Sequence, residues 1–595
     1  MKKNLLIALI VSLVVPTLYA IPPLSFTVTP NAISNTYSGV VTLDINGLTN
    51  TEQVVVKTYL DLNSNGAIDT GEPQIDAFKV RDGGASVIGG ITNLNAPCDR
   101  NGNIGQIRMT FPINPATIME NIVGKHIFQL SSPTGRFASS NVVLTVTNAN
   151  LPQSMSGTVY SNGVPAPYAV IVEQDQALDH PVGGTIADAN GHYFLTLPAS
   201  SYVPIPTVFG CYYDFNTAPL IELTNGVTAT NDLNVTLAGP TTISGTIYDA
   251  ANSNGIGGLL LVVNSGSYFE VIFTDANGNY STAVTPSFWK IEPNKERLPR
   301  REYLVAHKSL QVDATSGSVT NANIPVYKGS AMYYGRIVDN FGNPFRNVEV
   351  SAGASDDQGN DYSAKGYSDT NGYYTVVVLG DGTNYWGVQS TDGKNEAFQN
   401  YVVNTFPSAQ FAVGQAVSAN FTALPTTGVI SGSVHDNSGT NVVDVTLMAT
   451  AVINGNNYSA LESSTDVLGH YSFAVADGQW TLEFLNGGGD DNLDAHGYVD
   501  VTAPHLVTVP PTNIVYNITV YPLGTPYLTE VQRNSSSSVI FNLHGSPNVN
   551  YTIQYSTNLG SGWNTLFSLQ LTNDPTFLSD QNATNASRYY RVQKN

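Results

Sequence analysis

Charged residues are scarce in this sequence, at 12% of 595 residues, about half the usual share of ~25%. The cationic ones are scarcest: 24 Lys and Arg stand against 45 Asp and Glu, which gives a formal net charge of −21. This sign excludes nucleic acid as an expected partner and opposes binding to an anionic membrane. The hydrophobic fraction of 42% is ordinary, so the shortage of charge does not indicate disorder.

Cysteine is nearly absent as well. The two residues, Cys98 and Cys211, lie in different predicted modules. Two thiols pair only when their Cα atoms come within about 7 Å. The sequence therefore leaves open whether a bridge joins these modules.

Long apolar runs are missing after the first twenty residues. Lys2 and Lys3 precede an apolar run from Leu5 to Val15, and Pro16 and Ala20 follow it. This order predicts a cleaved signal peptide over residues 1–20. No later segment approaches the ~20 apolar residues that a spanning helix needs. We therefore expect no membrane insertion and a secreted protein, extracellular or on the cell surface, with the periplasm as a further possibility.

What the sequence does contain is a fourfold repeat. Each copy opens on Gly-x-Val or Gly-x-Ile, and about thirty residues later carries Asp-x-x-Gly-x-Tyr. The opening glycines are Gly157, Gly245, Gly335 and Gly432, with steps of 88, 90 and 97 residues. The later markers begin at Asp188, Asp275, Asp369 and Asp466. One module is therefore used four times.

The second marker has the chemistry of a tight turn. An Asp side chain can accept hydrogen bonds from backbone N–H groups ahead of it, and Gly accepts a positive φ. We expect a hairpin tip, followed by a half-buried strand such as Tyr280 to Val284, because the residues there alternate. No copy shows helical periodicity over a helical length, so the modules should be nearly all β.

The two markers together resemble the carboxypeptidase-regulatory-like family. This resemblance implies an all-β fold, a tandem array of immunoglobulin-like or transthyretin-like β-sandwiches after the cleaved signal peptide. It also implies modules without catalytic residues, close to the starch-binding-like fold. The predicted copies span residues 153–239, 241–329, 331–424 and 428–523.

Two further β-sandwiches are expected to flank the repeats. Residues 25–149 lack both markers but alternate, as in Val54 to Leu60. Residues 526–595 resemble a small fibronectin-type-III-like module, with the run Tyr551 to Leu559 and Trp563. The chain would thus hold six small modules.

A calcium loop is the sharpest chemical motif. Within residues 61–72, Gly stands at position 6 and an apolar residue at position 8, as an EF-hand-type loop requires. The predicted ligands are Asp61, Asn63, Asn65, Ala67, Asp69 and Glu72. The flanks are a strand and Pro73 rather than two helices, and the alternative is an Asn-rich turn without metal. With three charged ligands, Ca²⁺ would bind weakly, at ~10⁻⁴ to 10⁻³ M, and stiffen the domain.

The tryptophans are expected in module cores and not on a sugar-binding platform. Tyr202, Trp289 and Trp480 all lie fourteen residues after the marker Asp, and Trp386 lies seventeen after it. A bulky ring at one equivalent position in each copy fits a core anchor, since each sandwich must fill the same space. Trp563 is expected to anchor the last module likewise.

A second acidic loop, with Asp490, Asp491 and Asp494 after three glycines, could hold a cation but is more simply explained as a solvated loop. No hydrolase or metalloprotease motif appears, so we expect no enzyme. The favoured function is a secreted scaffold or adhesin-like protein. The alternative is carbohydrate binding, and the expected partner is an extracellular polysaccharide or a cell-surface component.

Overall fold

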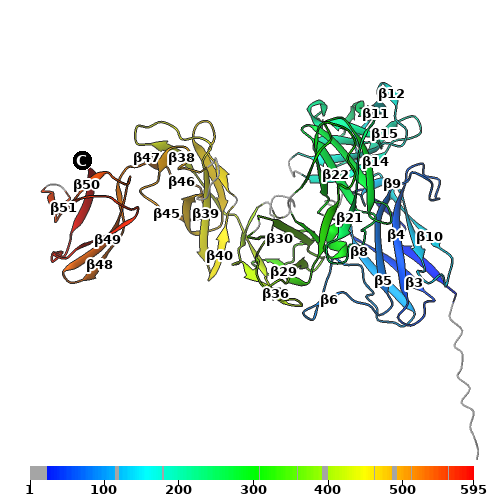
Figure 1. Ribbon diagram of the computed structural model, residues 1–595, viewed down its shortest axis with the longest axis horizontal. Coiled ribbons are helices and arrows are strands. Elements are labelled where there is room, and N and C mark those ends of the chain that lie inside the picture. The colour runs from blue at the N-terminus through cyan, green and yellow to red at the C-terminus, as the bar shows by residue number, and fades with distance from the viewer. Residues whose placement is uncertain are drawn as a thin grey trace, which may run out of the picture. The chain divides into compact units, whose positions relative to one another are not determined.

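A computed structural model describes residues 23–113, 119–176, 180–295, 297–306, 309–357, 359–390, 398, 400–460, 462–485, 492–510, 512–559 and 562–595. The predicted signal peptide and Asp490 and Asp491 lie outside the described residues. The fold is nearly all β, as predicted, and the described helical segments are two short 3₁₀ turns (Figure 1). No helix in this part of the chain has the length and apolarity to cross a membrane.

The chain divides into two compact units. The first holds residues 1–337, 344–398 and 407–420, and the second holds residues 338–343, 399–406 and 421–595. The division falls within the third predicted repeat. Within this repeat, residues 338–343, 399–406 and 421–424 belong to the second unit, and the rest belongs to the first.

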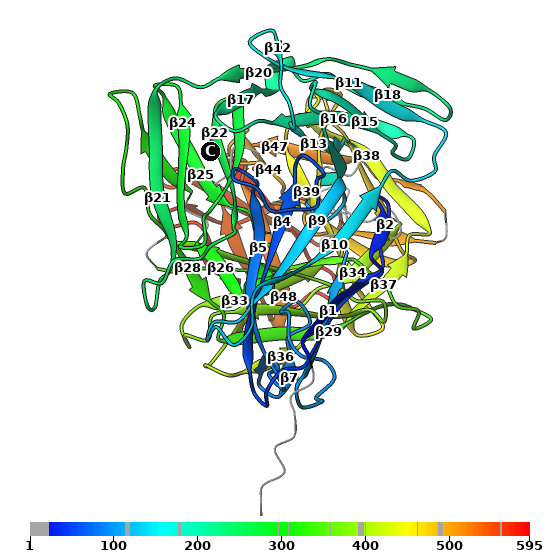
Figure 2. The ribbon, with the colours of Figure 1, turned by 90° about the vertical axis from the view of Figure 1, so that its right-hand side faces the viewer.

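The N-terminal module consists of two sheets. β1, β3 and β8 form one, and β5, β4, β9, β10 and β2 lie in that order in the other, side by side in Figure 2. Buried residues alternate along the strands and meet in a core that includes Leu43, Val56 and Leu130. The strands are β1 (Ser25–Thr29), β2 (Ala32–Ser34), β3 (Val40–Asn46), β4 (Gln53–Asp61), β5 (Gln74–Arg81), β6 (Val87–Ile88), β7 (Ile91–Thr92), β8 (Gln106–Pro112), β9 (Ile122–Ser131) and β10 (Ser140–Thr147).

The first two repeats follow a common plan of two facing sheets. In the second repeat, β22 pairs with β23 and β25 in one sheet, and β21 pairs with β24 and β28 in the other. The first repeat contains β11 (Ser154–Ser161), β12 (Val164–Pro165), β13 (Val170–Asp175), β14 (His180–Ile186), β15 (His192–Leu195), β16 (Ser200–Thr207), β17 (Cys211–Asp214), η2 (Phe215–Thr217), β18 (Ile221–Leu223), β19 (Thr228–Thr230) and β20 (Leu233–Leu237). The second contains β21 (Thr241–Asp249), β22 (Leu260–Ser265), β23 (Tyr268–Phe273), β24 (Asn279–Val284), β25 (Phe288–Pro293), η3 (Leu298–Arg301), β26 (Tyr303–Ala306), β27 (Leu310–Asp313) and β28 (Ile324–Lys328).

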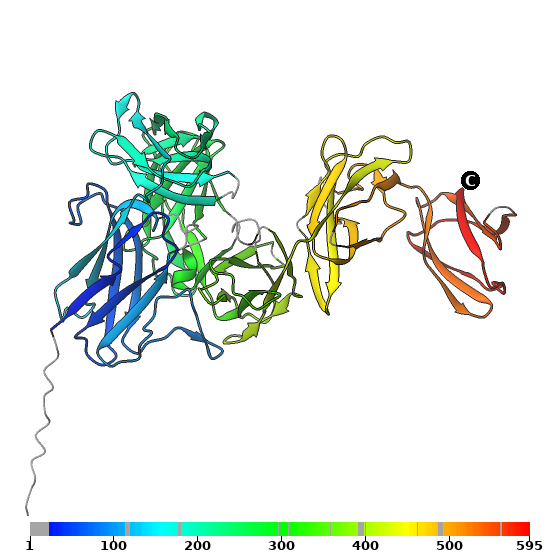
Figure 3. The same cartoon turned by 180° about the vertical axis from the view of Figure 1, so that it is seen from behind.

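The later modules repeat this plan. The C-terminal module again has two sheets, β48–β49–β52 and β51–β50–β53, drawn in orange to red in Figure 3. The third repeat contains β29 (Ala331–Asp339), β30 (Glu349–Ser355), β31 (Asp361–Tyr367), β32 (Tyr373–Val378), β33 (Tyr385–Ser390), β34 (Tyr401–Asn404), β35 (Ala409–Gln410), β36 (Ala416–Ser418) and β37 (Phe421–Pro425). The fourth contains β38 (Gly428–Asp436), β39 (Thr446–Ile453), β40 (Asn456–Ser459), β41 (Ser463–Ser464), β42 (His470–Val475), β43 (Gly478–Phe484), β44 (Tyr498–Val499), β45 (His505–Val509), β46 (Ile514–Val515) and β47 (Ile518–Pro522). The last module contains β48 (Tyr527–Ser535), β49 (Ser538–His544), β50 (Asn550–Ser556), β51 (Asn564–Gln570), β52 (Thr576–Asp580) and β53 (Tyr589–Lys594).

The Asp-x-x-Gly-x-Tyr marker is a tight turn, but the prediction of a hairpin tip is wrong. Asp275 Oδ1 accepts hydrogen bonds from the N–H groups of Asn277 and Asn279, and Gly278 has a φ of +82°. The strands on either side do not pair with each other: β23 pairs with β22, whereas β24 pairs with β21. The turn therefore carries the chain from one sheet of the sandwich to the other.

In each of the first three repeats, one strand near the end pairs both with a strand of its own repeat and with a strand of the next repeat. The first two residues of β17, Cys211 and Tyr212, pair with β20 of their own repeat, and the next two pair with β23 of the second repeat. In the same way β26 pairs with β28 and with β31, and β34 pairs with β37 and with β40. We call these three the lent strands. The equivalent strand of the fourth repeat, β44, pairs with β47 within the described part of the chain.

Candidate functional site

The predicted calcium loop joins β4 to β5 and has a compact structure. Asp61 is fully buried, and its two carboxylate oxygens accept hydrogen bonds from the N–H groups of Asn65 and Gly66. Glu72 closes the other end by accepting from the N–H groups of Leu62 and Asp69, each at 3.0 Å. The two terminal carboxylates thus hold the loop through its own backbone.

Three of the six predicted ligands converge on one point. The side-chain amides of Asn63 and Asn65 donate to the same Asp69 oxygen, at 2.7 and 2.6 Å. These two bonds lower the pKa of Asp69, whereas burial, with the charges of Asp61 and Asp69, raises the pKa of Glu72. Among the described residues no three His, Cys, Asp or Glu groups come together as a metal site. A cation here would need each amide turned by half a rotation, so that oxygen instead of nitrogen faces Asp69.

The remaining ligand, Ala67, would contribute only its backbone carbonyl. Its N–H donates to the Asn65 side chain at 2.7 Å. Lys125, from β9, donates to the Ser64 carbonyl at 2.7 Å and so places one positive charge beside the loop. The loop geometry suits calcium in part, and calcium binding remains a prediction.

The ring prediction is confirmed for the repeats and wrong for the last module. Tyr202, Trp289, Trp386 and Trp480 are all at most 1% exposed. The polar atoms of three of these rings donate to the carbonyl four residues earlier, from Tyr202 to Pro198, from Trp289 to Thr285 and from Trp480 to Ala476. Trp563 is only half-buried under the Arg591 guanidinium, and Tyr551 fills the core of that module instead.

The two cysteines are buried and unpaired. Asp494, the one member of the predicted acidic loop that is described, accepts a hydrogen bond from the N–H of Ala495.

A buried cluster of charges joins the N-terminal module to the second repeat, and the sequence analysis did not find it. Arg297, Arg300 and Arg301 come from η3 and the residue before it, and they reach Asp76 on β5 and Glu120 before β9. Arg301 Nη2 lies 2.8 Å from Asp76 Oδ1, and Arg300 Nη1 lies 2.5 Å from Glu120 Oε1.

The electrostatics of the cluster follow from its burial. Burial alone would raise the pKa of Asp76, but the positive charges of Arg301, Arg297 and Arg300 outweigh it and lower the pKa to about 2. Asp76 is therefore ionised at every physiological pH. Four cationic residues within residues 295–301 of a charge-poor chain are the sequence signal that could have indicated this cluster.

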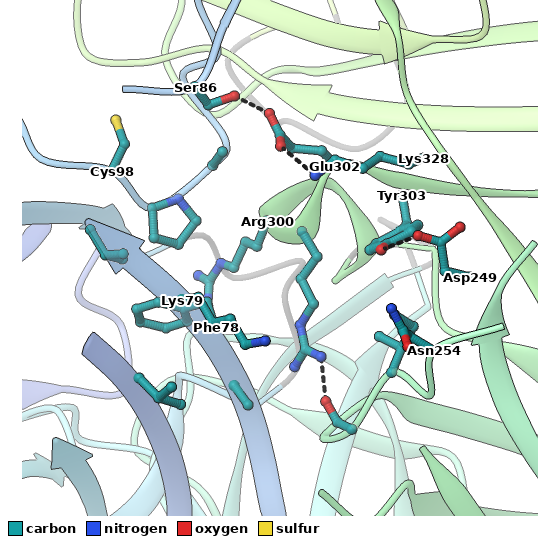
Figure 4. A pocket seen from close by; sticks show the side chains of 18 of the residues that line it. Phe78, Lys79, Ser86, Cys98, Asp249, Asn254, Arg300, Glu302, Tyr303 and Lys328 are labelled. Carbon is teal, nitrogen blue, oxygen red and sulfur yellow. Dashed lines mark hydrogen bonds and ion pairs between the residues drawn. The ribbon is translucent and has the colours of Figure 1, made fainter. Parts of the chain in front are cut away.

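Beside this cluster lies a cavity of about 590 Å³ between the N-terminal module and the second repeat. Figure 4 shows Lys79 and Arg300 on one side of it and Asp249, Asn254 and Tyr303 on the other. The floor is the outward face of the β4–β5 hairpin, because Lys57 and Lys79 alternate there with buried neighbours. The charged residues that line the cavity are Lys57, Lys79, Arg81, Arg300, Arg301, Lys328, Asp249 and Glu302.

The polar side chains in the walls of the cavity bond to one another. Tyr303 donates to Asp249 at 2.9 Å, and Lys328 lies 3.6 Å from Glu302. Glu302 also accepts from Ser86, which links the second repeat to the N-terminal module on this side. We call this space the basic cavity.

No protein-family model and no curated protein matches this chain. Several solved structures are similar to it. The Bacillus anthracis TIE protein is 12% identical, over 68% of this chain and 75% of that one, with a TM-score of 0.15. BcpA, the major pilin subunit of Bacillus cereus, is 9% identical over 47% and 99%, with a TM-score of 0.14. A DUF3823 family protein from Parabacteroides merdae is 15% identical over 28% and 89%, with a TM-score of 0.14. No inference about function rests on similarity at these TM-scores, and the resemblances to the carboxypeptidase-regulatory-like and fibronectin-type-III-like families stay predictions.

Proposed function

We propose that this chain is exported and works outside the cell as a non-enzymatic scaffold or adhesin-like protein. The observation that carries the proposal is the set of lent strands, β17, β26 and β34. Each ties a repeat to the next by backbone hydrogen bonds, in addition to the covalent linker. A ladder of this kind resists separation of neighbouring modules, because paired strands must part before the modules can.

The composition supports an extracellular setting. The strand surfaces are filled by uncharged polar residues, and the first twenty residues have the layout of a signal peptide. Five of the modules each have their own cluster of buried rings and aliphatic side chains. A further cluster, with Leu60, Ile75 and Leu260, joins the N-terminal module to the second repeat.

Calcium at residues 61–72 belongs to this proposal as a structural ion. The convergence of Asn63, Asn65 and Asp69 supports it. The ion would offset the mutual repulsion of Asp61, Asp69 and Glu72, which contributes to the raised pKa of Glu72.

Location is the property to test first. Intact producing cells are treated with a protease that cannot enter them, and the chain is followed by an antibody against the C-terminal module. We expect the chain in the medium or cleaved on the cell surface, with a mature N-terminus near Ile21. A chain that is protected in intact cells and keeps Met1 would contradict the proposal.

Carbohydrate binding is the second candidate function, and the basic cavity is the observation that favours it. A concave site of this volume falls within the range of small-molecule pockets, roughly 300–1,000 Å³.

A further inference from the structure

The basic cavity concentrates positive charge in a strongly acidic protein. Six of the 24 cationic residues of the chain line it, against two carboxylates. Even when the adjoining Arg297, Asp76 and Glu120 are included, seven cations face four carboxylates. A concave site lined by one sign of charge focuses the field and attracts ions of the opposite sign.

The positive groups differ in how far they are already neutralised. Arg300 and Arg301 are held by Asp76 and Glu120 and so form a fixed wall. Lys57 and Lys79, on the floor, have neither an ion pair nor a side-chain hydrogen bond within the described ranges. These two ammonium groups are therefore available to a ligand.

The floor is geometrically fixed. Lys57 pairs in register with Ala77, and Lys79 pairs with Val55, so the two lysines lie diagonally on one face of the β4–β5 hairpin. Their spacing is set by the sheet and not by a loop. Arg81 continues the same face, and its Nε donates to the Thr51 carbonyl.

The opposite wall offers groups that recognise hydroxyls. The Asn254 side chain is exposed and makes no side-chain hydrogen bond in the part of the chain that the structure describes. Asp249 and Tyr303 stand beside it as an acceptor and donor pair. A ligand that fills the cavity would thus meet ammonium groups on one side and, on the other, the Asn254 amide and the Asp249 carboxylate that accepts from Tyr303.

We propose that the basic cavity binds an anionic saccharide, with its acidic group on Lys57 and Lys79 and its hydroxyls toward Asn254, Asp249 and Tyr303. A neutral sugar would leave the two ammonium groups without a counter-charge, and a small inorganic anion would leave the opposite wall unused. The acidic group can be a carboxylate or a sulfate, since both accept hydrogen bonds from ammonium groups. This inference relies on the proposed function for its extracellular setting.

The test is calorimetric titration of the purified mature chain in low salt with four probes. They are a trigalacturonate, a sulfated trisaccharide, the neutral maltotriose and inorganic sulfate. We expect binding of one or both anionic saccharides, at least tenfold weaker binding of maltotriose and of sulfate, and a loss of affinity as salt rises. The two anionic probes distinguish carboxylate from sulfate.

Variants locate the site. Lys57→Glu with Lys79→Glu should weaken saccharide binding at least tenfold, and Lys57→Gln with Lys79→Gln should weaken it less. Lys594→Glu, at an exposed lysine of the C-terminal module, makes one such charge reversal away from the cavity and should have little effect. Thermal melting of each variant checks that it is folded.

Three results would overturn the inference: no binding of either anionic saccharide at millimolar concentration, sulfate binding as tight as saccharide binding, or equal losses in Lys594→Glu and the double variant. None of them depends on where the protein is found, so this inference and the proposed function can fail separately.

Discussion

The hydroxyl of Tyr374 donates a hydrogen bond of 2.5 Å to the carbonyl of Ala419, and this contact explains both halves of the repeat motif. A Cβ on the opening residue Gly335 would stand only 2.0 Å from that same carbonyl oxygen. The other copies share the arrangement, with Gly157 and Tyr193 at Asn231, Gly245 and Tyr280 at Ala322, and Gly432 and Tyr471 at Tyr516. The glycine has no side chain and so lets the carbonyl lie close to the strand. The tyrosine hydroxyl then donates a hydrogen bond to this carbonyl.

Gly335→Ala and Tyr374→Phe should therefore destabilise the third repeat by different routes. The added methyl must displace a backbone carbonyl, which costs about 1–3 kcal/mol. The lost hydroxyl leaves a buried carbonyl without its donor, which costs about 1–3 kcal/mol. Urea unfolding of each variant measures both. Tyr373→Phe, at an exposed neighbour, is the control, and equal effects of Tyr373→Phe and Tyr374→Phe would contradict this account.

Glu173 predicts an unusual pH dependence. Burial raises its pKa to about 8, and neither carboxylate oxygen has a hydrogen-bond partner within the described chain. Because the folded state holds the proton more tightly than the unfolded state, stability is fully present below about pH 4.5 and falls as the pH rises toward 8. Glu173→Gln should remove this dependence and make the protein more stable than wild type above pH 8, by several kcal/mol.

The second repeat suggests an apolar replacement for Glu173, because it has valine at the equivalent position. Val263 is the fourth residue of β22, as Glu173 is of β13, so Glu173→Val places the residue of one copy in another. Melting temperatures from pH 5 to 9 should be flatter in both variants than in wild type. A wild-type curve that rises over this range would refute the assignment.

Asp76 should be far more important to stability than an exposed acid. Asp76→Ala leaves the buried Arg301 guanidinium without its carboxylate, and breaking a buried pair in this way costs about 3–5 kcal/mol. Asp44→Ala removes an exposed pair with Arg108 and should cost below about 1 kcal/mol. If chemical unfolding showed the same loss of stability in the two variants, the buried charge cluster around Asp76 would not have the stabilising role proposed for it.

The same carboxylate predicts behaviour in acid. The pKa of Asp76 is lower in the folded state, about 2, than its ordinary value of 3.8. Its contribution is therefore present above pH 3.8 and is lost as the pH falls toward 2. Asp76→Asn should lose less stability than wild type over this interval, which acid titration followed by circular dichroism can measure.

Calcium should raise the melting temperature of the mature chain relative to chelator, with half-saturation at ~10⁻⁴ to 10⁻³ M. Asp69→Ala should abolish the shift, since this carboxylate is the point on which Asn63 and Asn65 converge. Asp313→Ala changes an exposed acid in the second repeat and should keep the shift. Identical melting curves for wild type in calcium and in chelator would remove the ion from the proposal.

The lent strands can be tested in β26. Val305 pairs with Ser363 of the third repeat, and Val305→Pro prevents regular pairing there because proline lacks the N–H and fixes φ. Val305→Ala keeps the backbone and loses only side-chain packing. Calorimetry should show a larger loss of stability, and more separated transitions, for the proline variant than for the alanine variant. Equal thermograms would show that the shared pairing contributes nothing to stability.

Local patterns predicted local features well. The period of two in Tyr280 to Val284 indicated a half-buried strand, and the recurring ring position indicated the cores around Trp289 and Trp480. The turn at Asp275 was recognised by its residues, but turn chemistry does not specify which sheet receives the next strand.

The contacts between modules could not be read from the sequence. Asp76 and Arg301 are 225 residues apart, and Ser86 and Glu302 are 216 apart. No local period links such pairs, so the buried charge cluster and the basic cavity required coordinates. For Trp563 the local pattern itself gave the wrong prediction. A large ring was expected in the core of the C-terminal module, but Tyr551 fills that core.

The lent strands also bear on how such a chain can change its length over evolutionary time. The second and third repeats each pair one of their strands with the next repeat and accept a strand from the repeat before. All three pairings are antiparallel. Insertion or deletion of one whole copy in the gene would restore a matching junction on each side without any new surface having to arise. The strand pairing at these junctions is therefore compatible with a change in the number of copies.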